Sequence, residues 1–170
     1  MTTLRRAVPA DAPRLAALAR WVWLDSYAEG GVTEAFAGYL DAAFTPAAFR
    51  QLLQDAQRAL WVAEDADALC GMAQLCRAAP APVAADRPAP DVELERLYVA
   101  PPCTGRGLGR ELLAAARGTW PQQALWLSVW VGNAGARRFY EREAGRRVGE
   151  TDFLLDGQAH RNLVYAWSAS

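Results

Sequence analysis

The chain has 170 residues, 52% of them hydrophobic, and a formal net charge of -1, which favours one folded domain over residues 1–170 and excludes a disordered chain. The near-neutral charge argues against a nucleic-acid partner, and no apolar run has the length of a membrane span or a signal-peptide core, so we expect no membrane partner and a cytoplasmic location. One histidine and three cysteines without Cys-x-x-Cys spacing indicate that there is no metal site.

The first part of the chain predicts a strand, a group of helices and a hairpin. Asp11 is a plausible cap for the first helix, and Thr45-Pro46 breaks the helical pattern that follows. The sequence Asp-Ala-Asp-Ala between two apolar runs predicts a hairpin turn. The expected elements are a strand at 4–8, a helix from 11 to about 23, one or two helices within 26–57, and strands at 60–64 and 69–75.

The second part alternates strands and helices after a segment rich in proline and alanine, residues 77–90. That segment has too many prolines for a helix or a central strand, so we expect a surface loop. A mixed sheet flanked by helices, an α/β fold, follows from the whole order of elements. The remaining expected elements are a strand at 92–99, a helix at 107–119, a strand at 125–131, a helix at 134–144, and two strands after 147 joined at Asp156-Gly157.

Residues 97–109, LYVAPPCTGRGLG, place three glycines between a strand and a helix. Bare N–H groups at a helix N-terminus favour an anion, and glycine allows a close approach to the backbone. The spacing is not that of a dinucleotide-binding loop, because the third glycine comes one residue early, and the chain has no lysine for a Walker motif. A tight packing turn without a ligand remains the alternative.

The loop reads V-x-P-x-x-x-G-x-G-x-G from Val99 to Gly109, and a second motif, N-x-x-A-x-x-F-Y, follows from Asn133 to Tyr140. Together they resemble the GCN5-related N-acetyltransferase (GNAT) superfamily. Over most of the chain, except the loop at 77–90, the sequence is similar to the PaiA-type polyamine N-acetyltransferases. The resemblance implies one GNAT domain, with a mixed and mostly antiparallel sheet that splays between two parallel strands and is flanked by helices.

The resemblance also implies acetyl-CoA as co-substrate and no metal. Backbone N–H groups from about Thr104 to Arg110 are expected to hold its pyrophosphate, and the backbone at 97–99 is expected to pair with the pantetheine arm. Asn133 can cap a helix, contact the cofactor, or do both. The full set of expected cofactor-binding residues is Leu97, Tyr98, Val99, Thr104, Gly105, Arg106, Gly107, Leu108, Gly109, Arg110, Asn133 and Tyr140.

Three residues are candidates for catalysis. Glu93 and Glu95, on the strand before the loop, are expected to remove the proton from the amine. The alternative is that they are solvated strand charges, paired with Arg96 or another arginine. Tyr140 is the proton donor to the departing thiolate that the resemblance implies, and the alternative is a packing role beside Phe139. Trp126, Trp130 and Trp23 are candidates for walls of the acceptor site, since cations bind well to aromatic faces.

The sequence thus predicts an acetyl-CoA-dependent N-acetyltransferase that acetylates a primary amine by direct attack in a ternary complex. The expected acceptor is a small molecule, a polyamine such as spermidine or spermine, for which Glu34, Asp41, Glu93 and Glu95 are candidate carboxylates. A protein N-terminus, another small amine, and a CoA-binding regulatory module with little turnover remain alternatives. Either a monomer or a homodimer fits the sequence.

Overall fold

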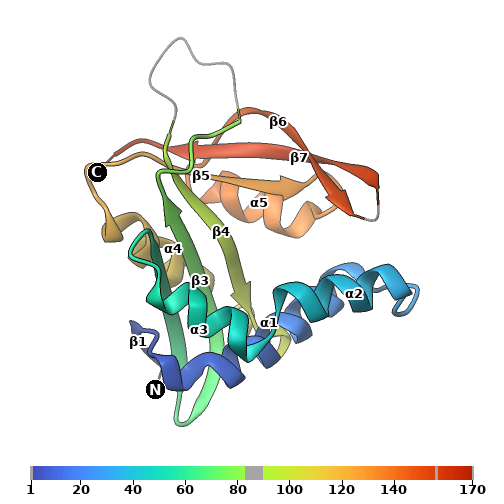
Figure 1. The fold of residues 1–170 in the computed structure, drawn as a ribbon. Helices are drawn as coiled ribbons and strands as arrows, with labels where there is room; N and C mark the ends of the chain where they lie inside the picture. Colours follow the sequence, from blue (N-terminus) through green and yellow to red (C-terminus); the bar gives the residue numbers. More distant parts are fainter. Residues whose placement is uncertain (1, 83–89, 156, 170) are drawn as a thin grey trace. The chain divides into compact units, whose positions relative to one another are not determined.

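The computed structural model describes residues 2–82, 90–155 and 157–169 (Figure 1). The strands are β1 (Thr2–Arg6), β2 (Arg58–Asp65), β3 (Ala68–Arg77), β4 (Val92–Val99), β5 (Leu125–Trp130), β6 (Arg146–Leu155) and β7 (Gln158–Trp167). The helices are α1 (Ala12–Tyr27), α2 (Glu34–Ala43), α3 (Pro46–Gln54), α4 (Leu108–Thr119) and α5 (Ala134–Arg142), with 3-10 turns η1 (Pro9–Asp11) and η2 (Pro101–Cys103). None of the helices in these ranges is long and apolar enough to cross a membrane.

The strands form one seven-stranded mixed sheet in the order β1-β2-β3-β4-β5-β7-β6. β1 pairs with β2, β5 with β7 and β6 with β7 in antiparallel fashion, whereas β4 and β5 are parallel. The predicted α/β fold with a mixed sheet and flanking helices is therefore confirmed.

Most element boundaries follow the sequence patterns, with three differences. The first strand, β1, spans Thr2–Arg6 and not 4–8, and α1 continues to Tyr27, beyond the expected end near residue 23. The one or two helices expected within 26–57 are two, α2 and α3, with the break at Thr45-Pro46 that the sequence predicted. Thr45 separates them because its hydroxyl accepts a hydrogen bond from the Ala48 N–H at 3.1 Å and starts α3 with Pro46 in the first turn. The helix expected at 134–144 ends at Arg142, since Ala144 has a φ of 62°.

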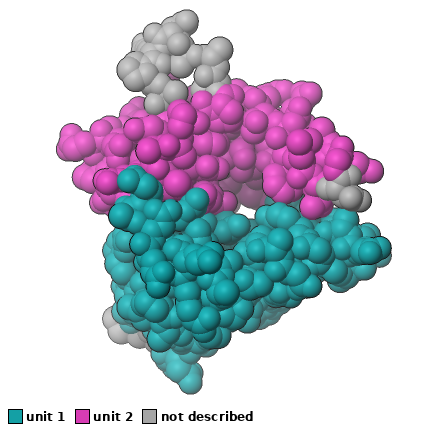
Figure 2. All heavy atoms as spheres, viewed as in Figure 1, with its two compact units in different colours: residues 1–74, 96–116 teal, residues 75–95, 117–170 magenta. Residues whose placement is uncertain are grey.

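Contacts divide the chain into two compact units (Figure 2). Unit 1 comprises Met1–Gln74 and Arg96–Ala116, and unit 2 comprises Leu75–Glu95 and Arg117–Ser170. Each unit has its own buried apolar side chains. Whether the two units fold together as one domain is a different question, so the single domain over residues 1–170 stays a prediction.

In unit 1, an ion network fastens the first strand to the first helix. The carboxylate of Asp11 is 1% exposed and accepts from Arg5 at 2.7 and 2.9 Å and from Arg14 at 2.6 Å. It also accepts from the Val8 N–H. The Arg5 guanidinium is the main reason that the pKa of Asp11 lies well below its usual range. Asp11 precedes α1 as expected, but its side chain binds these groups and does not cap the helix.

The closest packing in unit 1 occurs at Gly71 of β3. A Cβ atom at this position would lie 2.9 Å from both the Tyr98 carbonyl oxygen and Leu112 Cδ1, and 3.6 Å from Val99 Cγ2. The absence of a side chain at Gly71 therefore lets β4 and α4 approach β3. The same contact holds both ends of the segment that contains the glycine loop.

Unit 2 packs α5 against the C-terminal strands. Tyr140 of α5 contacts the rings of Tyr165 and Trp167 at centroid distances of 6.2 and 6.0 Å. On β5, Trp126 donates to the Ala79 carbonyl at 2.6 Å. Ala79 lies within the Pro/Ala-rich segment predicted as a surface loop at 77–90, of which residues 83–89 lie outside the described residues.

We predict that Gly71→Ala lowers the free energy of unfolding by about 1–3 kcal/mol, because one of the two contacted atoms is a backbone oxygen that cannot move cheaply. Chemical denaturation of both proteins measures this change. Gly38→Ala on α2, where a Cβ would meet nothing within 4 Å, is the matched control and should be neutral or slightly stabilising. Equal stability of Gly71→Ala and the original chain would refute the packing argument.

Candidate active site

The segment after β4 is a fixed turn followed by an open loop. The Ala100 N–H donates to the Cys70 carbonyl at 2.8 Å, which ties the end of β4 to β3. The Cys103 N–H then donates to Ala100 at 2.8 Å, and both the N–H and the hydroxyl of Thr104 donate to the Pro101 carbonyl. The turn η2 thus uses the polar groups of Thr104 internally, so the open part of the loop begins at Gly105.

Two glycines of the open loop adopt the left-handed region, with φ of 76° at Gly105 and 84° at Gly107. Neither N–H group, nor that of Arg106 between them, donates to a group of the described residues. A Cβ at either glycine would meet nothing within 4 Å. The backbone here is thus exposed and offers successive donors, as a diphosphate group requires.

Helix α4 begins directly after these glycines, at Leu108. The first N–H groups of a helix have no partner within the helix, and the helix dipole adds partial positive charge there. The Gly107 carbonyl already accepts from Glu111 at 3.1 Å, so the loop and the first turn are continuous. An anion at this position would meet both the free loop amides and the start of α4.

The strand that leads into the loop pairs with β5 only at its beginning. Among the described residues, the parallel register consists of Val92 opposite Leu125 and Glu93 opposite Trp126. β4 continues to Val99 beyond this register. Leu97, Tyr98 and Val99, the residues expected to pair with the pantetheine arm, lie in that continuation.

The two candidate base residues lie in the unit 2 part of β4. Glu93 and Glu95 are half-buried. Because Glu93 is in register with Trp126, both side chains project to the same face of the sheet. Both glutamates have further polar or electrostatic contacts within the molecule, so neither is an isolated solvated charge.

Asn133 sits at the start of α5, and its Oδ1 accepts from the Ala136 N–H at 3.0 Å. This confirms the helix-cap interpretation of Asn133. The turn before it is tight, because a Cβ at Gly132 would lie 2.3 Å from the ring of Trp130. Arg137 donates to the Val131 carbonyl at 2.9 Å and closes the turn from the helix side.

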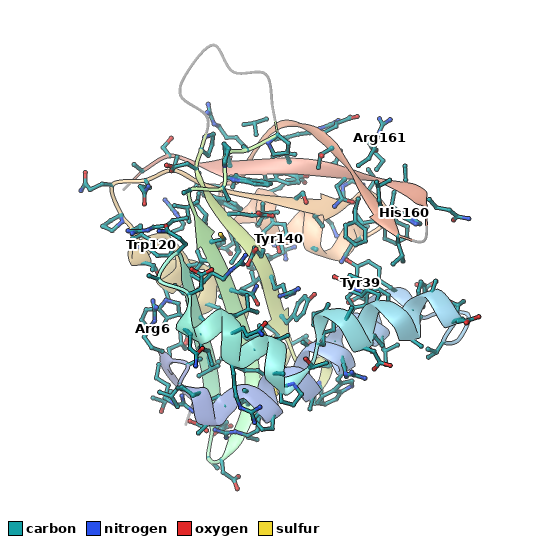
Figure 3. The ribbon with its side chains drawn as sticks, in the orientation of Figure 1. Arg6, Tyr39, Trp120, Tyr140, His160 and Arg161 are labelled. Carbon is teal, nitrogen blue, oxygen red and sulfur yellow. The ribbon has the colours of Figure 1, made fainter. Side chains whose placement is uncertain are left out.

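Tyr140 is 8% exposed and lies among the rings of Phe139, Tyr165 and Trp167 (Figure 3). Its carbonyl accepts from the Gly145 N–H at 2.8 Å, which ends the helix. The Tyr165 hydroxyl donates to Glu141 at 2.7 Å. The ring of Tyr140 is therefore held rigidly, as precise placement of a proton donor requires.

The three tryptophans proposed as acceptor walls have packing roles in the structure. Trp126 is buried against Val164 and Ala166, and its indole N–H is bonded to Ala79. Trp130 lies against Gly132. Trp23 is 5% exposed, at the centre of an aromatic cluster in unit 1.

Arg96, considered from the sequence as an ion-pair partner of Glu93 or Glu95, is bound by other groups in the structure. Its guanidinium lies over the Phe44 ring, 4.9 Å from the centroid, and donates to Gln74 at 2.7 Å. An arginine next to an apolar strand end was the available signal, but Phe44 and Gln74 are too distant in sequence for their contacts to be inferred.

No group of three or more His, Cys, Asp or Glu side chains in the described ranges is arranged to hold a metal ion.

Comparison with known proteins decides the family. Residues 16–145 match the acetyltransferase (GNAT) family. The chain belongs to the GNAT family. It is 32% identical over 155 residues to an uncharacterized N-acetyltransferase of Mycobacterium bovis, a match that covers 89% of this chain and 93% of that protein. Family membership makes the chain an acetyl-CoA-dependent N-acetyltransferase.

Solved structures share the fold at low sequence identity. The PaiA N-acetyltransferase from Thermoplasma acidophilum, in complex with coenzyme A, superposes with a TM-score of 0.69 at 20% identity over 98% of this chain and 99% of that one. Arabidopsis thaliana NAA60 in complex with acetyl-CoA gives 0.72 at 17% identity, with 98% of both chains covered. These structures support the GNAT fold.

We predict that Gly107→Val weakens acetyl-CoA binding at least about tenfold. A β-branched residue disfavours a φ of 84°, and its side chain would occupy the open space beside the free amides. Calorimetric titration with acetyl-CoA measures the dissociation constant. Gly118→Val, the same substitution at the other end of α4 where φ is not in the left-handed region, should leave binding unchanged. Unchanged affinity in Gly107→Val would refute the loop assignment.

Proposed function

We propose that the protein transfers the acetyl group of acetyl-CoA to a primary amine by direct attack, with the pyrophosphate held by the loop from Gly105 to Arg110. The observation that carries this proposal is the run of free N–H groups at Gly105, Arg106 and Gly107 directly before α4. In the reaction a nitrogen–carbon bond forms and the carbon–sulfur bond breaks. The single acetyltransferase domain predicted for residues 1–170 is part of this proposal.

The amine must lose a proton before or during attack. A primary ammonium has a pKa of about 10.4, so deprotonation at pH 7 costs about 4–5 kcal/mol. Glu93 or Glu95 accepts this proton, directly or through a water molecule. Their half-buried position on β4 and the shared face of Glu93 and Trp126 support this role.

The departing thiolate must gain a proton, and Tyr140 supplies it. A phenol with an ordinary pKa of about 10 is protonated at neutral pH and can donate a hydrogen bond to sulfur as negative charge develops. The position of Tyr140 in the N-x-x-A-x-x-F-Y motif and the close packing of its ring support this role. Asn133 supports it indirectly by capping the helix that bears Tyr140.

A polyamine is the first candidate acceptor. The sequence is similar to the PaiA-type polyamine N-acetyltransferases, and the Thermoplasma structure with the same fold is named a PaiA N-acetyltransferase. A polycation requires several unpaired carboxylates. Asp41, one of the four carboxylates considered for this purpose, pairs with Arg20 at 2.8 Å. A peptide N-terminus or an amino acid, each with one reacting amine, needs fewer carboxylates and is the second candidate.

Release of the CoA thiol by the purified protein tests the reaction. The panel contains spermidine, spermine, putrescine, amino acids, short peptides and aminoglycosides, each with acetyl-CoA and a blank without amine. Acceptor-dependent release supports the proposal and identifies the class. Release no faster than the blank with every amine, in a protein that binds acetyl-CoA, would contradict it and favour a regulatory CoA-binding module.

We predict that Tyr140→Phe lowers kcat by about a hundredfold or more and leaves the affinity for acetyl-CoA nearly unchanged, because only the proton donor is removed. Tyr165→Phe is the matched control, since it removes a phenol hydroxyl from the same cluster that already donates to Glu141. The control should lose some stability and keep its turnover. Equal kcat values for Tyr140→Phe and the original enzyme would remove the proposed role.

A further inference from the structure

A cluster of aromatic rings in unit 1 extends from α1 to the end of β4. Trp23 is its centre, with ring centroids of three neighbours within 5.1 Å, and Phe44 joins Tyr39 to Tyr98. Figure 3 labels Tyr39 on α2. Trp23 and Phe44 are buried, whereas the other rings are half-buried and form the accessible part of the cluster. The half-buried members are Tyr27, Phe36, Tyr39 and Tyr98.

Arg96 of β4 is held at the end of this cluster by two contacts. The Phe44 ring lies under the guanidinium at 4.9 Å, and Nη1 donates to Gln74 Oε1 at 2.7 Å. The Tyr98 ring packs against the same Phe44 ring, with centroids 6.4 Å apart, and projects to the same face of β4 as Arg96. Because Gln74 is 1% exposed and Phe44 is fully buried, the guanidinium is fixed by groups that cannot move away.

Both groups that hold Arg96, the Phe44 ring and the Gln74 amide, are uncharged. No carboxylate among the described residues pairs with Arg96. This sets it apart from the arginines of unit 1 that form ion pairs with carboxylates, which are Arg5, Arg14, Arg20, Arg58 and Arg106. A half-buried cation held only by neutral partners gains free energy when an anion binds to it.

The phenol groups next to Arg96 can donate hydrogen bonds to such an anion. Burial raises the pKa of Tyr98, and the nearby Tyr39 and Tyr27 raise it further, whereas Arg96 acts in the opposite direction. The net pKa is well above the ordinary value, so the Tyr98 hydroxyl stays protonated at any working pH. A fixed guanidinium and a protonated phenol together match the two oxygens of a carboxylate.

The orientation of Arg96 separates this anion from the phosphates of acetyl-CoA. Val99 lies with Leu112 of α4 against the same position at Gly71. Phe44, at the end of α2, contacts both Tyr98 and Arg96. These two residues precede Val99 on β4 by one and three positions. Alternate residues of a strand project to opposite faces. Arg96 therefore faces away from α4, whose N-terminus bears the pyrophosphate loop.

We propose that Arg96 and the Tyr98 hydroxyl bind a carboxylate of the acceptor, so that the acceptor is an amino acid, a primary amine that carries its own carboxylate, and not a polyamine. This inference rests on the proposed function, because it concerns the acceptor of the same reaction. Since Arg96 and Glu95 are adjacent on β4 and project to opposite faces, it also requires that the proton of the amine reaches the glutamate through a water molecule. Arg96 acts as a specificity-determining residue, since it binds a part of the acceptor that does not react.

Matched acceptor pairs test the proposal. Amino acids, lysine and glutamate among them, are each compared with their own carboxamides, and putrescine and cadaverine represent amines without a carboxylate. The carboxamide has the less basic α-amine, so a preference for the free amino acid cannot arise from easier deprotonation. We expect kcat/KM to favour at least one amino acid over its carboxamide by about tenfold to a hundredfold, as a charge-assisted hydrogen-bonded pair gives.

Arg96→Gln should abolish this preference and leave the dissociation constant of acetyl-CoA within about twofold of its original value. Arg96→Lys, which keeps the charge and loses the planar fork, should retain part of the preference. Arg50→Gln, at an exposed arginine on α3 of the same unit, is the control and should keep the full preference. Circular dichroism and thermal unfolding check that each variant is folded.

A preference for putrescine or cadaverine over every amino acid would overturn the proposal, and so would a preference that survives in Arg96→Gln. The proposal would also be overturned if Arg96→Gln bound acetyl-CoA more weakly and kept the acceptor preference. Arg96 would then bind the phosphates of acetyl-CoA. Titration with N-acetylated amino acids and their carboxamides separates the two proposals. Binding that depends on both Arg96 and the carboxylate, without turnover of any amine, supports the carboxylate site and contradicts the proposed reaction.

Discussion

The close approach at Gly71 is the constraint on which the arrangement of unit 1 depends. With no side chain at this position, the Tyr98 backbone and the Leu112 side chain can both lie against β3. Two functional features follow from this one contact. The glycine loop lies between β4 and α4, so it is anchored at both ends. The alternation along β4 then directs Tyr98 and Arg96 to the face opposite α4, where Phe44 receives them.

The loop and the C-terminal helix use different physical means to prepare groups for chemistry. In the loop, two glycines lie in the left-handed region, and the N–H groups there have no partner among the described residues. An anion or water must satisfy them. In α5, Tyr140 is held by ring packing, a helix cap at Asn133 and a tight C-terminal turn at Gly145. In the proposed function, the first arrangement binds an anion through the backbone, whereas the second places one side chain precisely.

The arginines of unit 1 differ in whether a carboxylate neutralises their charge, and this difference bears on the identity of the acceptor. Arg5 and Arg14 share Asp11 and Glu64, and their ion pairs fasten β1 and β2 to α1. Among the described residues, Arg96 has only neutral partners, the Phe44 ring and the Gln74 amide, which hold it in place. These neutral partners fix the position of the guanidinium and leave its charge available to a ligand. An arginine with a purely structural role does not need an available charge.

The sequence by itself determined the family, the order of elements and the location of the glycine loop that we propose binds the cofactor, because these depend on short motifs and on local periodicity. Val99 to Gly109 and Asn133 to Tyr140 each lie within one strand–turn–helix segment, so their spacing is a local property. The roles of Trp23 and Trp126 as packing residues, the ion pair of Asp41 and the support of Arg96 were decided by the tertiary structure. Each depends on contacts between residues far apart in the chain, such as Arg96 with Phe44 and Gln74, and neither residue type nor spacing encodes those pairings.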